Sequence, residues 1–396
     1  MHDGTPEPVG VRIARARKLR GLTQHGLAQR ASYSRSLIAQ VEAGHRVATP
    51  AFVSAIASAL NMTPADVYGQ PFHMPGPADQ IHYAVPELRR ILAYVGVGPD
   101  LQGAPRSLAD LDSQVIHMRR LLLRARFSKA AEGLPAVLEE LTFWAYETDE
   151  PSAWAALHRA HAIAVSLTRR LGYGGDSLAW MDRAAESARR SQNPHLPLVA
   201  TAPRALLLAE MSQYKPGLKL LREARRDVHE DLPDHGEVVG YLALRAAVVA
   251  ARAGKKHSSE AWEYFGQAEE VIASGRLGKP VHGTQFGAAN VAIHGAAVAV
   301  ELGDLDEAAR RDRAIDKQLL ADLVPERRAH HEIDMARMHV ELGDYDRATA
   351  RITSAEKVAP QMTRFHPSAR TVVTHLVDVR RTIPEPLRGL QIRMGV

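Results

Sequence analysis

A five-residue segment, VELGD, occurs at residues 300–304 and again 40 residues later at residues 340–344. Alanines flank each copy at matching distances from its glycine, as Ala296 and Ala308 do around Gly303. Self-similarity at a fixed period is typical of stacked helical hairpins, in which small residues allow two helices to approach closely. The repeat therefore predicts that much of the chain is an array of helical pairs.

Other turns support the same period. They fall near Phe127, Gly174, Tyr214 and Gly254, at intervals of about 40 to 49 residues. We expect six hairpins between residues 107 and 360, followed by a last helix near Pro367 to Arg381. No strand-like alternation appears beyond residue 80, so the predicted fold class is all-α.

Composition excludes several classes of protein. The 396 residues include no cysteine, which excludes a disulfide framework and favours a reducing compartment. The sequence contains no run of about 18 apolar residues, so no membrane span is predicted. The first residues do not resemble a signal peptide. We expect a cytoplasmic protein without membrane contact. Arginines outnumber lysines by 41 to 9, which is typical of GC-rich genomes and suggests an actinobacterial source.

Positive charge is concentrated at the N-terminus. Residues 1–68 contain eight Lys/Arg and four Asp/Glu, a net of 8 − 4 = +4, while the other residues contain 42 and 41, a net of +1. This asymmetry points to an anionic partner for the first segment, although a solvated basic face would give the same count.

Capping signals divide this N-terminal segment into five short helices. Thr23 and Ser34 can cap the second and third, and Thr49 and Thr63 each precede a proline at the first helical position. Apolar residues at helical spacing predict the core, which comprises Ile13, Leu19, Leu22, Leu27, Ala28, Ala31, Ile38, Val41, Val53, Ile56, Ala57 and Leu60. A short turn joins the second and third helices, as in a helix-turn-helix.

The stretch RKLRGLTQHGLAQRASYSRSLIAQVEAGHRVAT resembles the lambda-repressor-like helix-turn-helix family, also called the XRE family, over about residues 9 to 68. The resemblance implies that the third helix reads DNA bases in the major groove. The implied base-reading residues are Ser34, Arg35, Ser36, Leu37 and Gln40, the implied phosphate contacts are Gln24, His45 and Arg46, and Arg17 with Glu42 is an implied structural pair.

Three parts of the chain are expected. They are a DNA-binding domain at 1–68, a linker and connecting helix at 69–106 that contains Pro and Gly, and an α-solenoid at 107–396. The units around Gly303 and Gly343 resemble the tetratricopeptide repeat, whose first helices line a concave face.

Polar residues recur at the positions that would line this face. They lie thirteen and nine residues before the turn glycines Gly254, Gly303 and Gly343. The resulting candidate effector groove consists of Tyr241, Arg245, Asn290, His294, His330 and Asp334, with Arg337 one helical turn further. An asparagine amide both donates and accepts, which suits a peptide backbone. By analogy of architecture, the groove would bind a peptide or small-molecule effector, or it is a hydrated surface without a ligand.

Signals for catalysis are weak. The segments HEDLPDH and HHEID lack the H-E-x-x-H spacing, and His158 with His161 has no evident third ligand. No phosphate-binding loop or serine nucleophile elbow is found, so we expect no enzyme, no metal and no cofactor.

We therefore predict a transcriptional regulator that binds double-stranded DNA. One reading helix contacts too few base pairs for specificity, which favours a homodimer on an inverted-repeat operator. The alternative is a protein-interaction adaptor whose repeat groove binds a protein partner.

Overall fold

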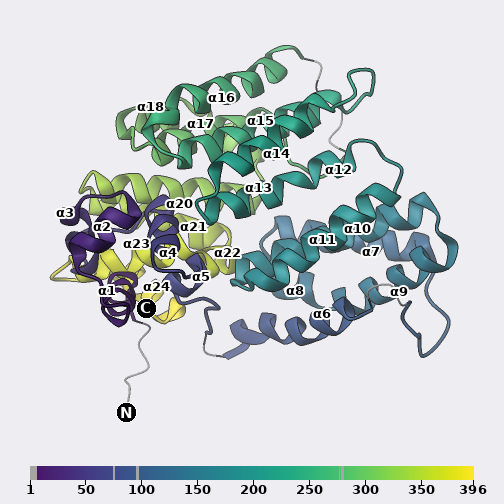
Figure 1. The fold of residues 1–396 in the computed structure, drawn as a ribbon, viewed down its shortest axis with the longest axis horizontal. Coiled ribbons are helices and arrows are strands. Elements are labelled where there is room, and N and C mark those ends of the chain that lie inside the picture. Colours follow the sequence, from purple (N-terminus) through teal and green to yellow (C-terminus); the bar gives the residue numbers. More distant parts are fainter. Residues whose placement is uncertain (1–6, 75, 95–97, 276, 278–280) are drawn as a thin grey trace.

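The computed structural model describes residues 7–74, 76–94, 98–275, 277 and 281–396, and every regular element in these ranges is a helix. The chain forms a small N-terminal helical domain and a large body of paired helices (Figure 1). The all-α prediction is confirmed.

The N-terminal domain contains the five predicted helices. They are α1 (Val9–Leu19), α2 (Gln24–Ala31), α3 (Arg35–Glu42), α4 (Pro50–Ala59) and α5 (Pro64–Tyr68). All four predicted caps are present: the side chains of Thr23, Ser34, Thr49 and Thr63 each accept a hydrogen bond from a backbone N–H in the first turn. Local signals therefore fix where α2 to α5 begin.

Close packing between α1 and α3 depends on Gly10. A Cβ atom there would lie 2.0 Å from the carbonyl oxygen of Val41, so only glycine permits this approach. Ala28, a predicted core residue, is buried. The assignment of Leu19 to the core is wrong, because this residue is 80% exposed. It occupies the last helical position of α1, where the helix has already passed beyond the core.

The segment after α5 packs firmly against the rest of the molecule. It contains the 3-10 helix η1 (Gly76–Tyr83) and the helix α6 (Ala84–Leu92). Phe72, Met74 and Ile81 are all buried. The proline-containing stretch that we expected to be a linker therefore contributes apolar side chains to the interior.

Six antiparallel hairpins follow, as the repeat pattern predicts. They are α7 (Leu108–Leu123) with α9 (Leu134–Thr148), α10 (Pro151–Leu171) with α11 (Gly174–Arg190), α13 (Thr201–Glu210) with α14 (Tyr214–Arg226), α15 (His235–Arg252) with α16 (Ser258–Ala273), α17 (Ala288–Leu302) with α18 (Leu305–Ala314), and α20 (Pro325–Glu341) with α21 (Tyr345–Val358). Short helices lie inside two hairpins, namely α8 (Phe127–Ala131) and η2 (Lys255–His257). Others lie between successive hairpins, namely α12 (Leu196–Val199) and α19 (Lys317–Asp322), and α22 (Pro360–Phe365) follows the last hairpin.

The chain ends with two helices where one was expected. Helix α23 (Pro367–Asp378) begins at the predicted proline and ends three residues before Arg381. Helix α24 (Glu385–Met394) was not predicted, and it packs on α23 and α21.

The hairpins do not form an open array, because the last ones return to the first. Contacts run from α7 through α10, α11, α13, α15 and α17 to α20, and α20 contacts α7. Two hydrogen bonds join Ser128 to Gln361 across this closure, at 3.1 Å and 2.7 Å. Arg170 also pairs with Glu326 there. The hairpins therefore form an α-solenoid that closes into a ring, with its last hairpin against its first.

One hydrophobic core connects the N-terminal domain with both ends of this ring. It includes Ile38 of α3, Phe127 of α8 and Phe365 of α22. A second core fills the hairpins from α13 to α17. In Figure 1 the N-terminal helices lie beside the C-terminal helices α20 to α24. The N-terminal domain is thus packed into the molecule and does not extend from it.

Candidate functional site

Helix α3 lies at the outer edge of the molecule, at the left in Figure 1. Ile38 and Val41 are buried and anchor the helix in the domain. The opposite side carries the predicted base-reading residues Ser34, Arg35, Ser36 and Gln40, all exposed. Leu37 differs from them, because it is half-buried against the core. The exposed face offers a guanidinium and a carboxamide, the groups that best read guanine and adenine.

A buried ion pair holds α3 against α1. The Arg17 side chain donates from Nε to Glu42 Oε1 at 2.6 Å and from Nη2 to Oε2 at 2.8 Å. Its Nη1 also donates to the Leu22 carbonyl oxygen. Burial alone would raise the pKa of Glu42, but hydrogen bonds from Arg17 and Gln24 lower it below its usual value. The pair stays ionised and connects three helices.

The predicted phosphate contacts lie in three different settings. His45 is exposed. The Gln24 side-chain amide donates to Glu42 at 3.0 Å, so its nitrogen is used within the domain. Arg46 Nη2 lies 3.0 Å from Glu341 Oε2 at the end of α20, and its side chain remains 50% exposed. An ion pair with the ring thus occupies one of the groups expected to contact DNA.

The N-terminal domain and the segment after α5 both contact the rest of the molecule. The Arg370 guanidinium stacks 4.2 Å from the centre of the Phe72 ring. The Gln70 amide donates to the Arg170 carbonyl oxygen at 3.3 Å, and α4 contacts α13. The residues predicted to read bases, Ser34, Arg35, Ser36 and Gln40, remain exposed beside these contacts.

A cavity of about 1150 Å³ lies between the ring and the N-terminal domain. Residues of α4, α5 and their connecting turn form part of its wall, among them Ser54, Met62 and Tyr68. Six of the seven predicted groove residues also line it: Tyr241, Arg245, His294, His330, Asp334 and Arg337. The pattern of polar positions before the turn glycines therefore located an interior surface.

Asn290 is the predicted groove residue that does not line the cavity. It is 3% exposed, and neither atom of its side-chain amide has a hydrogen-bond partner among the described residues. Its backbone carbonyl oxygen accepts from His294 Nδ1 at 2.7 Å. Burial, with Arg245 nearby, lowers the pKa of His294 well below its usual value, so this ring is neutral.

One group of charges in the cavity is balanced. Arg337 Nη1 lies 3.2 Å from Glu301 and 3.0 Å from Asp334, and Arg252 Nε lies 3.7 Å from Glu301. Burial would raise the pKa of Glu301, but the two guanidinium groups lower it below its usual value. Two cations thus face two carboxylates near α5.

A second group surrounds Glu326, which is almost fully buried. Arg170 donates to Glu326 Oε1, Arg327 Nε lies 3.4 Å from Oε2, and His330 Nε2 lies 3.4 Å from Oε1. Burial opposes the charge of this carboxyl group, but the nearby arginines hold its pKa well below the usual value. Sequence analysis missed Glu326, Arg170 and Arg327, because only the closure of the ring brings α10 and α20 together.

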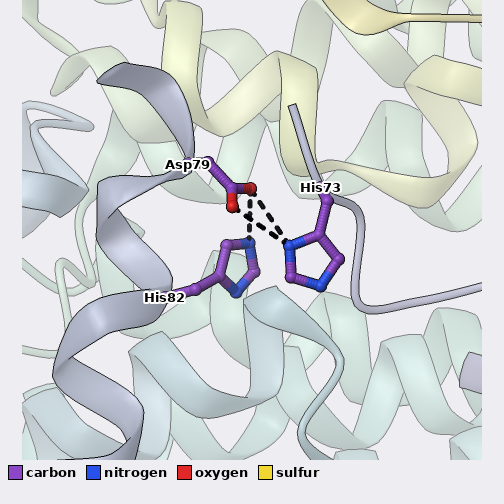
Figure 2. A group of neighbouring side chains, drawn as sticks. All are labelled: His73, Asp79 and His82. Atoms are coloured by element: carbon purple, nitrogen blue, oxygen red, sulfur yellow. Dashed lines mark hydrogen bonds and ion pairs between the residues drawn. The ribbon is translucent and has the colours of Figure 1, made fainter. Parts of the chain in front are cut away.

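Within the described ranges, two groups of His and Asp side chains resemble metal sites. In the first, His73 and His82 both point toward Asp79 (Figure 2), with His73 Nδ1 3.2 Å from the carboxylate. However, His82 Nε2 lies 3.1 Å from the Phe72 carbonyl oxygen, which can only accept, so this nitrogen carries a hydrogen and offers no lone pair. His82 Nδ1 faces the Tyr173 hydroxyl at 2.9 Å. These hydrogen bonds attach the segment after α5 to the ring.

The second group contains His195, Asp234 and His282. His195 Nε2 accepts from the His229 backbone N–H at 3.1 Å, so the hydrogen of a neutral ring is on Nδ1, which lies 2.9 Å from Asp234. His282 Nε2 contacts the same carboxylate. In this arrangement His195 has no free lone pair for a metal ion, and the group connects the start of α15 to α12.

The two histidines on α10 that sequence analysis considered together have separate structural partners. His158 Nδ1 donates to the Ala184 carbonyl oxygen at 2.8 Å, and His161 Nδ1 lies 2.9 Å from Ser187 Oγ. Burial lowers the pKa of His158 to about 4 and that of His161 to about 3. Both rings are neutral within the core.

These two histidines should make the protein sensitive to acid. Below pH 6.5 the unfolded chain binds protons that the folded chain excludes, so stability falls as the pH decreases from about 6.5 toward 4. The expected loss is about 1.4 kcal/mol per histidine per pH unit. Urea unfolding at pH 7 and pH 5 should show a smaller loss for His161→Gln than for the parent, and an unchanged loss for the exposed His25→Gln. Equal losses in all three proteins would contradict this assignment.

Comparison with known proteins supports the N-terminal fold. Residues 8–67 match the model of a helix-turn-helix domain family. Among solved structures, BtubC (BKLC) from P. vanneervenii is similar at 17% identity and a TM-score of 0.38, covering 69% of this chain and 96% of that one. Bacillus thuringiensis PlcR in complex with the peptide PapR7 and DNA is similar at 14% identity and a TM-score of 0.31, covering 85% of this chain and 98% of that one. No curated protein matches the chain. No helix in the described ranges is long and apolar enough to cross a membrane.

Proposed function

We propose that the protein is a cytoplasmic, sequence-specific transcriptional regulator and not an enzyme. The observation that supports this most strongly is the exposed polar face of α3 in a helix-turn-helix domain. Arg35 and Gln40 lie on that face, and the Arg17–Glu42 pair fixes its orientation. Arg35 would pair with guanine and Gln40 with adenine, while Ser34, Ser36 and Leu37 contact neighbouring groups. His45, Arg46 and the start of α2 at Gln24 would contact phosphates.

The active form would be a homodimer on an inverted repeat, since one α3 reads too few base pairs. The interior cavity would bind a peptide or small-molecule effector. Because α4 and α5 form part of its wall, a ligand that prefers one placement of the DNA-binding domain would shift the population toward it. The two copies of α3 would then match or miss the spacing of the half-sites.

Mapping of the DNA bound in cells tests the regulator proposal. The parent protein is compared with the double variant Arg35→Ala, Gln40→Ala and with a control, Arg226→Ala, Gln318→Ala, which removes the same groups from exposed positions on the ring. We expect sharp peaks that share an inverted repeat in the parent and control, and none in the α3 variant. Peaks that persist in the α3 variant would exclude α3 as the reading element. No peaks in any sample would favour the adaptor, whose partner a pull-down would identify.

Arg35→Ala alone should relax the base preference at one position. Loss of one bidentate contact costs about 1–3 kcal/mol of binding free energy against the preferred base. The measurement is binding of the purified protein to operator variants that differ at each position. A uniform loss across all sequences would identify Arg35 as a phosphate contact.

Neutralising Glu341 should strengthen DNA binding. Glu341→Gln releases Arg46 from an exposed ion pair, which is worth up to about 1 kcal/mol, so affinity should rise roughly twofold to fivefold at low salt. Glu87→Gln removes the same charge from an exposed site on α6 and serves as the control. Equal increases in both variants would show that net charge alone is responsible.

A further inference from the structure

The wall of the cavity contains more guanidinium groups than its carboxylates can pair. Around Glu326 lie Arg119, Arg170, Arg245 and Arg327, a local balance of 4 − 1 = +3. Arg119 and Arg245 feel the charges of both Glu326 and Arg327, so the four cations share one region of the wall. The group near Arg337 shows no such surplus.

Arg119 and Arg245 have no carboxylate partner in the part of the chain that the structure describes. Glu326 is occupied by Arg170, Arg327 and His330. No carboxylate among the described residues forms an ion pair with Arg119 or Arg245; Arg119 Nη2 donates to the Gly283 carbonyl oxygen at 2.5 Å. Arg245 is 9% exposed, its guanidinium lies 4.9 Å from the Tyr241 ring centre, and its Nε has no hydrogen-bond partner.

Such an arrangement is costly unless something in the cavity compensates it. A buried cation without a partner destabilises the folded chain, and repulsion between neighbouring arginines adds to this cost. Burial lowers the pKa of both Arg119 and Arg245, which reflects the same penalty. Replacement by an apolar side chain would remove the penalty, so the arrangement is better suited to binding than to stability.

We infer that the cavity binds a small anion with two or more carboxylate or phosphate groups, with Arg119, Arg245 and Arg327 as the donors. This inference rests on the proposed sensing function and names the chemical class of the effector. Guanidinium groups bind both kinds of anion through paired hydrogen bonds. A cavity of about 1150 Å³ accommodates such a molecule. Operator DNA is not the occupant, because the base-reading face of α3 lies outside the cavity.

Thermal unfolding and calorimetric titration of the full chain, without DNA, test the inference. Citrate and pyrophosphate are the probes, sodium chloride at matched ionic strength is the reference, and triglutamate represents an acidic peptide. At millimolar concentration we expect citrate or pyrophosphate to raise the melting temperature beyond the salt reference, as selective binding to the folded state requires. The more effective probe distinguishes carboxylate from phosphate recognition.

Variants locate the binding. Arg245→Met and Arg119→Met should each lower probe affinity at least tenfold, and without a probe neither should melt below the parent. Arg313→Met, at an exposed position on α18, should bind as the parent does. The inference is overturned if neither probe binds, if both cavity variants retain the parent affinity, or if triglutamate binds more tightly than both probes. Any of these results with intact, α3-dependent DNA binding would overturn this inference and leave the regulator proposal standing.

Discussion

Replacing Glu42 with alanine should destabilise the DNA-binding domain by about 3–5 kcal/mol. This is the usual cost of removing one partner of a buried ion pair. The Glu42 side chain is 7% exposed. Without it, the Arg17 guanidinium is buried without a carboxylate and the Gln24 amide loses its hydrogen-bond acceptor. Because the pair connects α1, α2 and α3, the orientation of the reading helix should be lost with it. DNA affinity should fall even at temperatures at which the ring remains folded.

Chemical unfolding and operator binding of the same samples measure both effects. Glu87→Ala is the matched control, since Glu87 is 55% exposed and pairs with Arg90 on the surface of α6. It should cost less than about 1 kcal/mol and leave DNA binding unchanged. Similar costs for the two variants would mean that the Arg17–Glu42 pair does not stabilise the domain.

Gly10→Ala should be the second severe substitution. The added methyl group would lie 2.0 Å from the Val41 carbonyl oxygen and 3.2 Å from the Glu42 Cα atom, both backbone atoms of α3. Backbone cannot rotate away as a side chain would, so α1 and α3 must separate. Overpacking of this kind costs about 1–3 kcal/mol or more. We expect a lower melting temperature and loss of operator binding.

Replacement of a second glycine in the same domain, Gly26, should have the opposite effect on stability. At Gly26, within α2, an added Cβ would lie 3.4 Å from Thr23 Oγ1 and 3.8 Å from Leu22 Cδ2, which is ordinary contact. Gly26→Ala should therefore stabilise the domain by roughly 0.5–1 kcal/mol, because alanine favours the helix. If both substitutions shift stability in the same direction, the close α1–α3 approach is not the cause.

The N-terminal domain could be predicted from sequence because its signals are local. Thr23, Ser34, Thr49 and Thr63 each cap a helix within three residues of their own position. Leu19 was misassigned for a related reason, since spacing continues to the end of α1 although the core does not. The spacing of apolar residues shows which face of a helix is buried. It does not show where along the helix the core that this face packs against ends.

The cavity could be predicted only in part. Tyr241, Arg245 and His294 were chosen from the repeat register, and all three line the cavity. Arg119 and Arg170 belong to other hairpins, and they join the wall because α7 and α10 meet α20 at the ring closure. Contacts between residues more than 150 positions apart leave no trace in local spacing. The helices α4 and α5 became part of the wall for the same reason.

The closure of the ring also limits how the molecule can move. An open superhelix lengthens gradually, since each joint between repeats contributes a small rotation. Here Ser128 of the first hairpin is hydrogen-bonded to Gln361 of α22, directly after the last hairpin, and Arg170 with Glu326 adds an ion pair nearby. Large deformation requires that one of these joints separates while the others persist. Conformational changes of the ring should therefore occur as discrete steps separated by an energy barrier, and not as gradual bending.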